Sequence, residues 1–221
     1  MAGLFVTIEG VEGAGKSTQI QMLLQRLVRL GVPALVSKEP GGTPLGQELR
    51  SLLLAPHLSG EKWCPESELL LFYADRAQHI ASVIRPALES GRLILVDRFD
   101  DSTRAYQGAQ GISEATMDKL GEVVLGRLRP HLTLILDMDP ALSLERVRAR
   151  NAAAGNAFKE TRFDNETLDF HTRVRKRFLA IAQRDPQRVT LVPADRTPEE
   201  VHEAIWAHLS PLLRSSGHPV E

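Results

Sequence analysis

The chain has 221 residues, of which 43% are hydrophobic and 25% are charged, with 27 Lys and Arg residues against 28 Asp and Glu residues. This balance excludes a disordered or collagen-like chain, and the length suits one large domain with a substantial core. The net charge of −1 provides no overall field that would attract nucleic acid or anionic lipid, so we expect no nucleic-acid partner.

The sequence favours a cytoplasmic protein. Cys64 is the only cysteine, which excludes an intrachain disulfide and fits a reducing cytosol. The first residues lead directly into a short apolar run, without the basic start and longer apolar stretch of a secretory signal. Because 18 successive apolar residues occur nowhere, we expect no membrane span.

Five short apolar runs alternate with helical patterns along the chain. They cover Leu4 to Ile8, Ala34 to Val36, Leu93 to Val96, Leu132 to Leu136 and Val189 to Val192. Runs of this length without polar alternation are typical of strands buried on both faces. Strands that alternate with helices predict an α/β fold, in which helices cover both sides of a parallel sheet.

Two of the expected helices have clear sequence patterns. One pattern extends from about Glu66 to Ser90. The last helix begins after Thr197, and Glu200 is placed to complete a capping box with it. Both patterns lie between or after the apolar runs, as the α/β prediction requires.

Two stretches interrupt the alternation within a single predicted domain, residues 1–221. Residues 55–66 form a polar insert with two prolines, and residues 151–161 have the composition of a flexible surface loop. The second stretch is flanked by arginines at positions 146, 148, 150 and 162. We therefore expect a mobile segment that carries several cations. Residues 215–221 are expected to form a flexible tail.

A glycine-rich motif follows the first apolar run and precedes an amphipathic helix. Its spacing is Gly, four residues, then Gly-Lys-Ser. In such a motif backbone N–H groups turn inward around phosphate oxygens, while Lys16 reaches the outer phosphates and Ser17 ligates magnesium. The sequence thus predicts binding of a nucleoside triphosphate with Mg²⁺. The predicted nucleotide-binding residues are Gly10, Val11, Glu12, Gly13, Ala14, Gly15, Lys16, Ser17 and Thr18.

The motif alone leaves GTP switches, motor-type ATPases and small-molecule kinases open. A GTP switch would normally carry an Asn/Thr-Lys-x-Asp motif to read its base, and no such tetrapeptide occurs. This counts against a switch.

Two further pairs of residues suggest a second ligand. Asp97 and Arg98 follow the third apolar run, at the strand end where open α/β sheets bind ligands. Asp97 is a candidate magnesium ligand and Arg98 a candidate phosphate clamp, with a strand-end ion pair as the alternative. Phe72 and Arg76 are four residues apart on one helix face, so they offer a ring to stack on a base and a donor fork to bind it. The alternative is a core aromatic beside a solvated arginine.

Together these motifs resemble the thymidylate kinase family, which phosphorylates dTMP to dTDP. The similar segments are Phe5–Gln19, Lys38–Thr43, Leu49-Arg50, Phe72–Arg76, Asp97–Phe99, Ser102-Thr103 and Ala105–Gly108. The resemblance implies a P-loop kinase fold with a five-stranded parallel sheet and a small mobile lid, here about residues 145–165, usually in a homodimer. It also implies ATP as phosphoryl donor with Mg²⁺, and a step of dTTP synthesis.

The resemblance implies a role for each matching residue. Phe72 would stack on thymine, and Arg76 would form hydrogen bonds with the carbonyl edge of that base. Ser102 and Gln107 would help hold the base, and Tyr106 would exclude a ribose 2′-hydroxyl. The sugar 3′-hydroxyl would face Glu12, and the monophosphate would be held by Arg50 and Arg98.

Two further features concern the cations that would bind phosphate. Lys38 stands where the family usually has arginine, so a point charge replaces a donor fork. The variable loop positions carry no cation, and family members of this kind take their transition-state arginine from the lid. The candidates here are Arg148, Arg150 and Arg162, unranked.

The acceptor in this interpretation is a phosphate oxygen, which is already anionic, so catalysis requires alignment and cations such as Lys16 and Arg98 rather than a base. A nucleoside kinase is the rival enzyme, and its hydroxyl acceptor would need Glu39 or Glu12 as base. A P-loop protein that uses ATP only as a switch is the rival of another class. His79 we interpret as structural or incidental.

Overall fold

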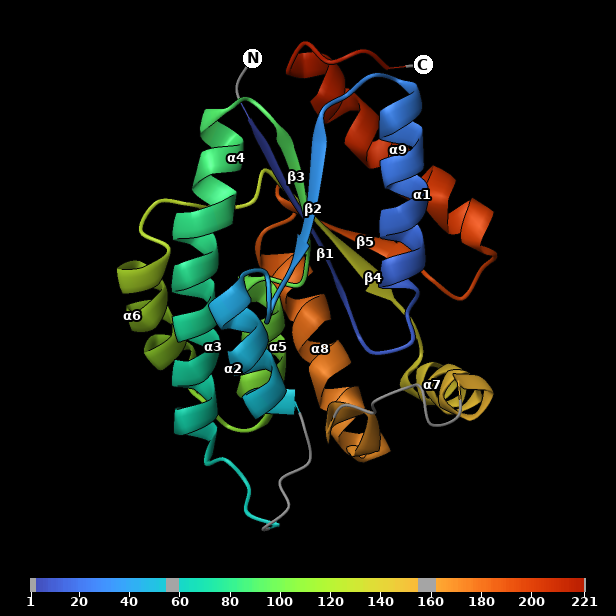
Figure 1. Ribbon diagram of the computed structural model, residues 1–221. Helices are drawn as coiled ribbons and strands as arrows, with labels where there is room; N and C mark the ends of the chain where they lie inside the picture. The colour runs from blue at the N-terminus through green and yellow to red at the C-terminus, as the bar shows by residue number, and fades with distance from the viewer. Residues whose placement is uncertain (1–2, 55–59, 155–161, 221) are drawn as a thin grey trace.

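The computed structural model of the protein describes residues 3–54, 60–154 and 162–220 (Figure 1). Its centre is a parallel sheet of five strands in the order β2-β3-β1-β4-β5. The strands are β1 (Leu4–Gly10), β2 (Ala34–Lys38), β3 (Leu93–Asp97), β4 (Leu132–Asp137) and β5 (Val189–Pro193). The predicted strands are confirmed, and each continues one or two residues beyond its apolar run, to the edge where polar residues begin.

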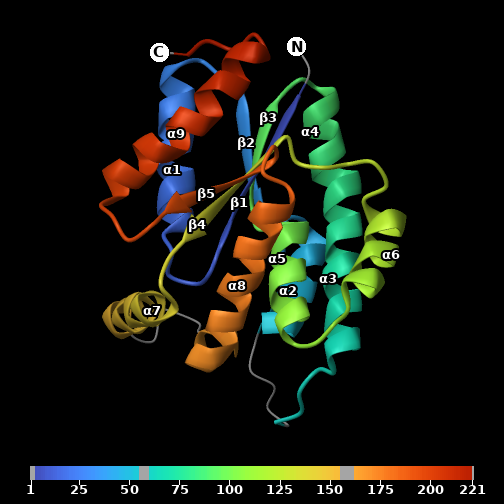
Figure 2. The same ribbon diagram turned by 180° about the vertical axis from the view of Figure 1, so that it is seen from behind.

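Helices lie on both faces of the sheet (Figures 1 and 2). On one face are α1 (Lys16–Arg29) and α9 (Pro198–Ser215), which contact each other. The opposite face is covered by α3 (Pro65–His79), α4 (Arg85–Glu89), α5 (Asp100–Ala109) and α8 (Leu168–Arg184). The remaining helices are α2 (Pro44–Leu54), α6 (Glu114–Val124) and α7 (Pro140–Ala154). The α/β prediction is therefore confirmed.

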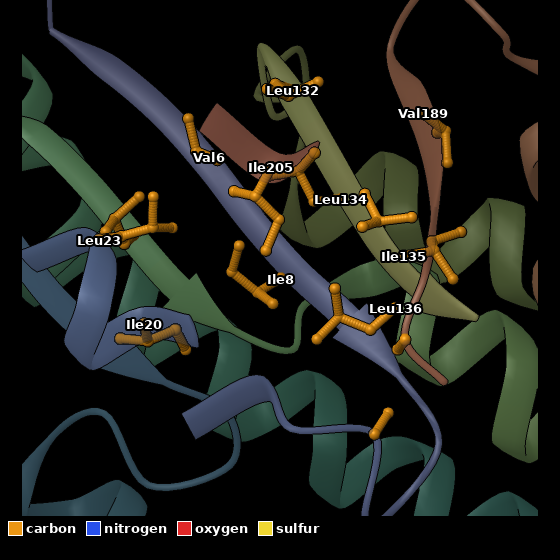
Figure 3. Close-up of a cluster of buried hydrophobic side chains, with 14 of the residues drawn as sticks. Val6, Ile8, Ile20, Leu23, Leu132, Leu134, Ile135, Leu136, Val189 and Ile205 are labelled. Atoms are coloured by element: carbon orange, nitrogen blue, oxygen red, sulfur yellow. The ribbon is translucent and has the colours of Figure 1, made fainter. Parts of the chain in front are cut away.

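Side chains of the central strands fill a core on each face of the sheet. Val6 and Ile8 point to the side of α1, where they pack with Ile20, Leu23 and residues of β4 (Figure 3). Phe5, on the other side of β1, packs with residues of α3. β1 is buried along its whole length. Its apolar surface therefore stabilises the fold by about 25 cal/mol for each Å² removed from water.

The helix boundaries follow local chemistry, with some differences from the prediction. The capping box of Thr197 and Glu200 is present at the start of α9. The long pattern from Glu66 to Ser90 is helical throughout, but a π-helical segment, Ile80–Ile84, separates α3 from α4. Residues 151–154, expected in a loop, continue α7, and the rest of that stretch, 155–161, lies outside the described residues, as do residues 55–59 of the polar insert.

The flexible tail expected for residues 215–221 stays a prediction, and two side chains of this segment are buried or packed on the core. His218 is only 4% exposed, and Val220 packs against the core. The described helices include none that is long and apolar enough to cross a membrane.

Candidate active site

A cavity of about 450 Å³ opens at the carboxyl edge of the sheet. The strands β1 and β3 are neighbours there, with Ile8 opposite Asp97, so the glycine-rich loop after β1 lies beside the residues after β3. The loop contributes Glu12, Gly13, Gly15, Lys16, Ser17 and Thr18 to the wall of the cavity. The other predicted residues in the wall are Lys38, Arg50, Phe72, Arg76, Asp97, Arg98, Ser102, Tyr106, Gln107 and Arg150.

The glycine-rich loop has the backbone of a phosphate cradle. Gly13 and Gly15 have φ values of 75° and 93°, the left-handed region that favours glycine. A Cβ at Gly13 would lie 2.6 Å from the carbonyl oxygen of Ser143, whereas a Cβ at Gly15 would meet nothing within 4 Å. The loop is therefore packed from behind and open toward the cavity, at the amino end of α1, where anions are stabilised.

Lys16 crosses the loop from the first turn of α1. Its Nζ donates to the carbonyl oxygens of Gly10, at 3.0 Å, and Val11, at 2.8 Å. Burial, followed by the charge of Arg98, lowers the pKa of Lys16 to about 8. An anionic ligand in the cavity would favour the charged form of this amine.

Asp97 has the chemistry of a metal ligand. Its Oδ1 is buried and has no hydrogen-bond partner in the described part of the chain. Ser17 lines the same cavity, so a carboxylate and a hydroxyl oxygen both face it. Mg²⁺ prefers hard oxygen ligands and keeps several waters, so the residues present fit this ion.

Arg98 is held in place by its backbone and by its side chain. It is the only non-glycine residue with positive φ, 68°, in the described ranges. Its N–H donates to the carbonyl oxygen of Ile8 at 3.0 Å. Its guanidinium donates to Glu12 at 2.8 Å, Ser102 at 3.0 Å and the hydroxyl of Tyr106 at 3.2 Å. The predicted phosphate clamp thus has a fixed position at the wall of the cavity.

Glu12 and Tyr106 form one network with this arginine. The hydroxyl of Tyr106 donates to Glu12 at 2.6 Å. Burial opposes ionisation of Glu12, but the charges of Arg98 and Lys16 outweigh it and lower the pKa of Glu12. The carboxylate is therefore charged and bound to its neighbours.

Glu9 is not part of the cavity wall, but it contacts Phe99 and Ser102, which are, and the sequence analysis missed it. It is fully buried in β1 and accepts hydrogen bonds from the N–H of Phe99, at 2.7 Å, and from the hydroxyl of Ser102. Burial, followed by the charge of Asp101, raises its pKa to about 8. An acidic residue directly after an apolar run was the available signal, because a buried carboxylate needs specific partners.

Phe72 and Arg76, the residues predicted to bind a base, also line the cavity, but Arg76 is buried rather than solvated. Only 1% of Arg76 is exposed, between the rings of Tyr73, at 5.0 Å, and Phe99, at 5.1 Å. Its guanidinium donates to Glu39 at 2.8 Å, Asp100 at 3.3 Å and Thr103 at 2.9 Å.

Arg50 and Gln107 have partners of their own beside this pair. Arg50 donates to the carbonyl oxygen of Pro40 at 2.9 Å, and burial followed by the charge of Arg98 lowers its pKa. The amide of Gln107 donates to Glu68 at 2.6 Å.

The arginines of α7 divide between two faces of the helix. Arg146 and Arg150, four residues apart, line the cavity, and Arg150 lies 3.6 Å from Asp164. Arg148 is exposed and is not part of the cavity wall. The side chain of Arg162 is outside the described part of the structure. Helical periodicity from Arg150 would have indicated Arg146, which flanked the predicted segment but was not a candidate.

The rival prediction of a carboxylate base finds little support in this geometry. Both oxygens of Glu39 accept hydrogen bonds or ion pairs, from Arg76 and from His79 at 2.9 Å. Glu12 is likewise bound to Arg98 and Tyr106. Both residues line the cavity, but each carboxylate is already paired with an arginine of the site, which lowers its availability as a general base.

A P-loop after the first strand, an Asp-Arg pair on the neighbouring strand and a cavity lined by cations together define a nucleotide phosphotransferase of the P-loop class. Comparison with known proteins gives the particular family. The model of the family described as thymidylate kinase matches residues 8–205. The chain therefore belongs to the thymidylate kinase family.

Curated relatives agree over nearly the full length. The thymidylate kinase of Syntrophotalea carbinolica is 46% identical over 96% of this chain and 98% of its own. The thymidylate kinase of Thermomicrobium roseum is 47% identical over 95% and 96%. A crystal structure of thymidylate kinase from Ehrlichia chaffeensis superposes with a TM-score of 0.74 at 31% identity, covering 95% of this chain and 99% of that one. The predicted family, P-loop kinase fold and enzyme class are confirmed.

Proposed function

We propose that this cavity transfers the γ-phosphoryl group of ATP to dTMP, giving dTDP and ADP. ATP would bind at the glycine-rich loop, and dTMP at the wall that contains Phe72 and Arg76. One observation carries the proposal: a single cavity is lined both by loop residues, among them Gly13, Gly15 and Lys16 to Thr18, and by Phe72 and Arg76. A donor and an acceptor nucleotide bound to these walls would have their phosphates between them.

The acceptor oxygen of a monophosphate is already anionic, so the reaction needs no base to form the nucleophile. Its obstacle is repulsion between two polyanions. Lys16 and Arg98 lie at the wall of the cavity to offset this charge, and their fixed positions reduce the reorganisation that the transition state requires. Arg146 and Arg150 supply further positive charge from the side of α7.

Mg²⁺ is the metal that we propose to accompany ATP, held by Ser17 and, directly or through water, by Asp97. The unpartnered Oδ1 of Asp97 supports this assignment. A divalent ion held by these residues would neutralise part of the phosphate charge.

Selection of the deoxynucleotide rests on the network of Glu12, Tyr106 and Arg98. Tyr106 is held by hydrogen bonds to both charged partners, so its ring cannot move aside without breaking them. We propose that this rigidity excludes a ribose 2′-hydroxyl, that Glu12 faces the 3′-hydroxyl, and that Ser102 and Gln107 contact the base. Arg50 and Lys38 would assist in binding the monophosphate.

The proposal is tested by a coupled assay for ADP with ATP, Mg²⁺ and a panel of acceptors. The panel includes dTMP, dUMP, dCMP, thymidine and ribothymidine monophosphate. We expect dTMP to be the preferred acceptor and thymidine to be inactive. Preference for thymidine would instead support the nucleoside kinase, and tight ATP binding without any diphosphate product would support the regulatory alternative.

We further propose that the protein is a cytoplasmic homodimer in the dTTP pathway. The family resemblance supports the dimer, and the single cysteine is compatible with a reducing compartment. Sedimentation equilibrium tests the first part: a mass of 24.4 kDa at all concentrations would identify a monomer.

A further inference from the structure

His79 belongs to a chain of polar side chains that leads to the cavity. Its ring is fully buried at the end of α3. Nε2 lies 2.7 Å from the hydroxyl of Ser37, and Nδ1 lies 2.9 Å from Oε1 of Glu39. The other oxygen of Glu39 accepts from Nε of Arg76 at 2.8 Å. The chain thus connects Ser37 on β2, through His79 and Glu39, to Arg76 at the cavity.

The chemistry of the partners defines which nitrogen of His79 carries the proton. The carboxylate of Glu39 can only accept hydrogen bonds, so Nδ1 must be the donor. Nε2 is then available to accept from the hydroxyl of Ser37, and a neutral ring satisfies both contacts. A ring that orients a carboxylate, which in turn orients a third group, is the arrangement by which outer residues fix a functional side chain.

Arg76 depends on Glu39 for its orientation. The other acceptors of its guanidinium, Asp100 and Thr103, both lie on α5. Glu39, the third acceptor, lies on a different segment, directly after β2. Because the guanidinium is planar, it cannot keep hydrogen bonds to acceptors on both segments if the carboxylate of Glu39 changes its orientation. The orientation of Glu39 therefore sets the direction of the N–H groups that remain for a ligand.

His79 also packs directly against the loop that carries Glu39. A Cβ at Gly42 would lie 2.4 Å from the imidazole ring, so the ring occupies the space that any side chain at this position would need. The π-helical segment begins immediately after His79, and such segments are frequent at functional sites. Both observations indicate that the imidazole ring has one specific position in the fold.

We infer that His79 is a positioning residue for base selection, which acts through Glu39 to fix the guanidinium of Arg76 against the carbonyl edge of the acceptor base. This inference rests on the proposed function. The edge in question carries a carbonyl in thymine and an amino group in cytosine, so a misdirected donor fork costs binding to thymine and not to cytosine.

The matched variants His79→Asn and His79→Gln test the inference. The amide of asparagine places an N–H near the position of Nδ1, whereas that of glutamine places it near Nε2. Loss of a buried, charge-assisted hydrogen bond predicts that His79→Gln lowers kcat/KM for dTMP about tenfold while kcat/KM for dCMP stays within about threefold. His79→Asn should retain the wild-type preference. His202→Gln, on α9 and also buried, is the control and should leave the preference unchanged.

Equal losses with dTMP and dCMP, or equal effects of asparagine and glutamine, would overturn the inference and leave His79 a packing residue. Nitrogen NMR of the wild-type protein provides a measurement that needs no variant: we expect the proton on Nδ1, and a proton on Nε2 alone would overturn the link to Glu39. Wild-type protein that fails to phosphorylate dTMP refutes the proposed function, whereas the NMR result judges the histidine contact separately.

Discussion

The two sides of the cavity differ in how their arginines are held. Arg76 and Arg98, on the acceptor side, each donate to three side chains, and the side chain of Arg76 is 2% exposed. On the α7 side, the side chain of Arg150 is 44% exposed, donates to Asn151 at 3.2 Å and lies 3.6 Å from Asp164. Arg76 is therefore more deeply buried than Arg150, so its side chain has less conformational entropy left to lose when a ligand binds.

The largest effect is expected for two buried or partly buried cations with fixed hydrogen-bond partners, Arg98 and Lys16. Arg98→Ala or Lys16→Ala should lower kcat/KM for dTMP about 10²-fold or more, because each removes a fixed charge from the phosphoryl-transfer region. Steady-state kinetics measures this loss. A reduction of less than tenfold in either variant would remove that residue from transition-state stabilisation.

The metal site should show the next largest effect. Asp97→Asn keeps the size of the side chain but removes its charge, so we expect the Mg²⁺ concentration for half-maximal activity to rise about 10-fold to 100-fold. Titration of activity with Mg²⁺ at constant ATP measures the shift. An unchanged titration curve would assign Asp97 to the strand-end ion pair considered from the sequence.

The α7 side offers a matched pair. Arg150→Ala should reduce kcat about tenfold, since its charge faces the cavity, and Arg148→Ala should change kcat less than about twofold. Comparison of kcat for the two variants under identical conditions tests whether the face of α7 matters. Equal effects would show that only the total charge of this helix contributes.

The smallest effect is expected on the free energy of unfolding, through the carboxyl group of Asp75. Burial, followed by the charge of Glu39, raises the pKa of Asp75 from 3.8 to about 6. Between these pH values the unfolded state loses a proton that the folded state keeps, so stability falls as the pH rises and the loss is complete above about 6. Asp75→Asn keeps an oxygen to accept from the N–H of Gly41 and removes this loss.

Linkage limits the gain from Asp75→Asn to about 3 kcal/mol. The amide N–H group would take the place of the buried, unpartnered Oδ2 and lose its hydrogen bonds to water, so we expect a net gain of about 1 kcal/mol at pH 7. Urea unfolding at pH 4 and pH 7 measures it. The difference between variant and wild type should shrink toward zero at pH 4, and a difference independent of pH would contradict the assigned pKa.

The fold was accessible from the sequence because its signals are local. The five apolar runs and the cap at Thr197 each depend on a few neighbouring residues. The glycine-rich loop could be identified for the same reason, since strand, glycines and helix are contiguous.

The contacts behind the site could not be predicted in this way. The network of Arg76 joins residues 24 to 37 positions apart, and Glu9 lies 93 positions from Ser102. Such pairings depend on how the elements pack. The sequence indicates only a structural or incidental role for His79 for this reason: its partners, Ser37 and Glu39, are 42 and 40 positions away.

The left-handed backbone of Arg98 has a consequence for protein engineering. A residue with a side chain loses about 1–2 kcal/mol in this region of backbone space, which glycine would not lose. Stabilisation programmes that replace positive-φ residues by glycine would select position 98. They would thereby remove the guanidinium that Glu12, Ser102 and Tyr106 surround. The carboxylate of Glu12 would then stay buried without its ion-pair partner, so glycine at this position costs stability as well as turnover.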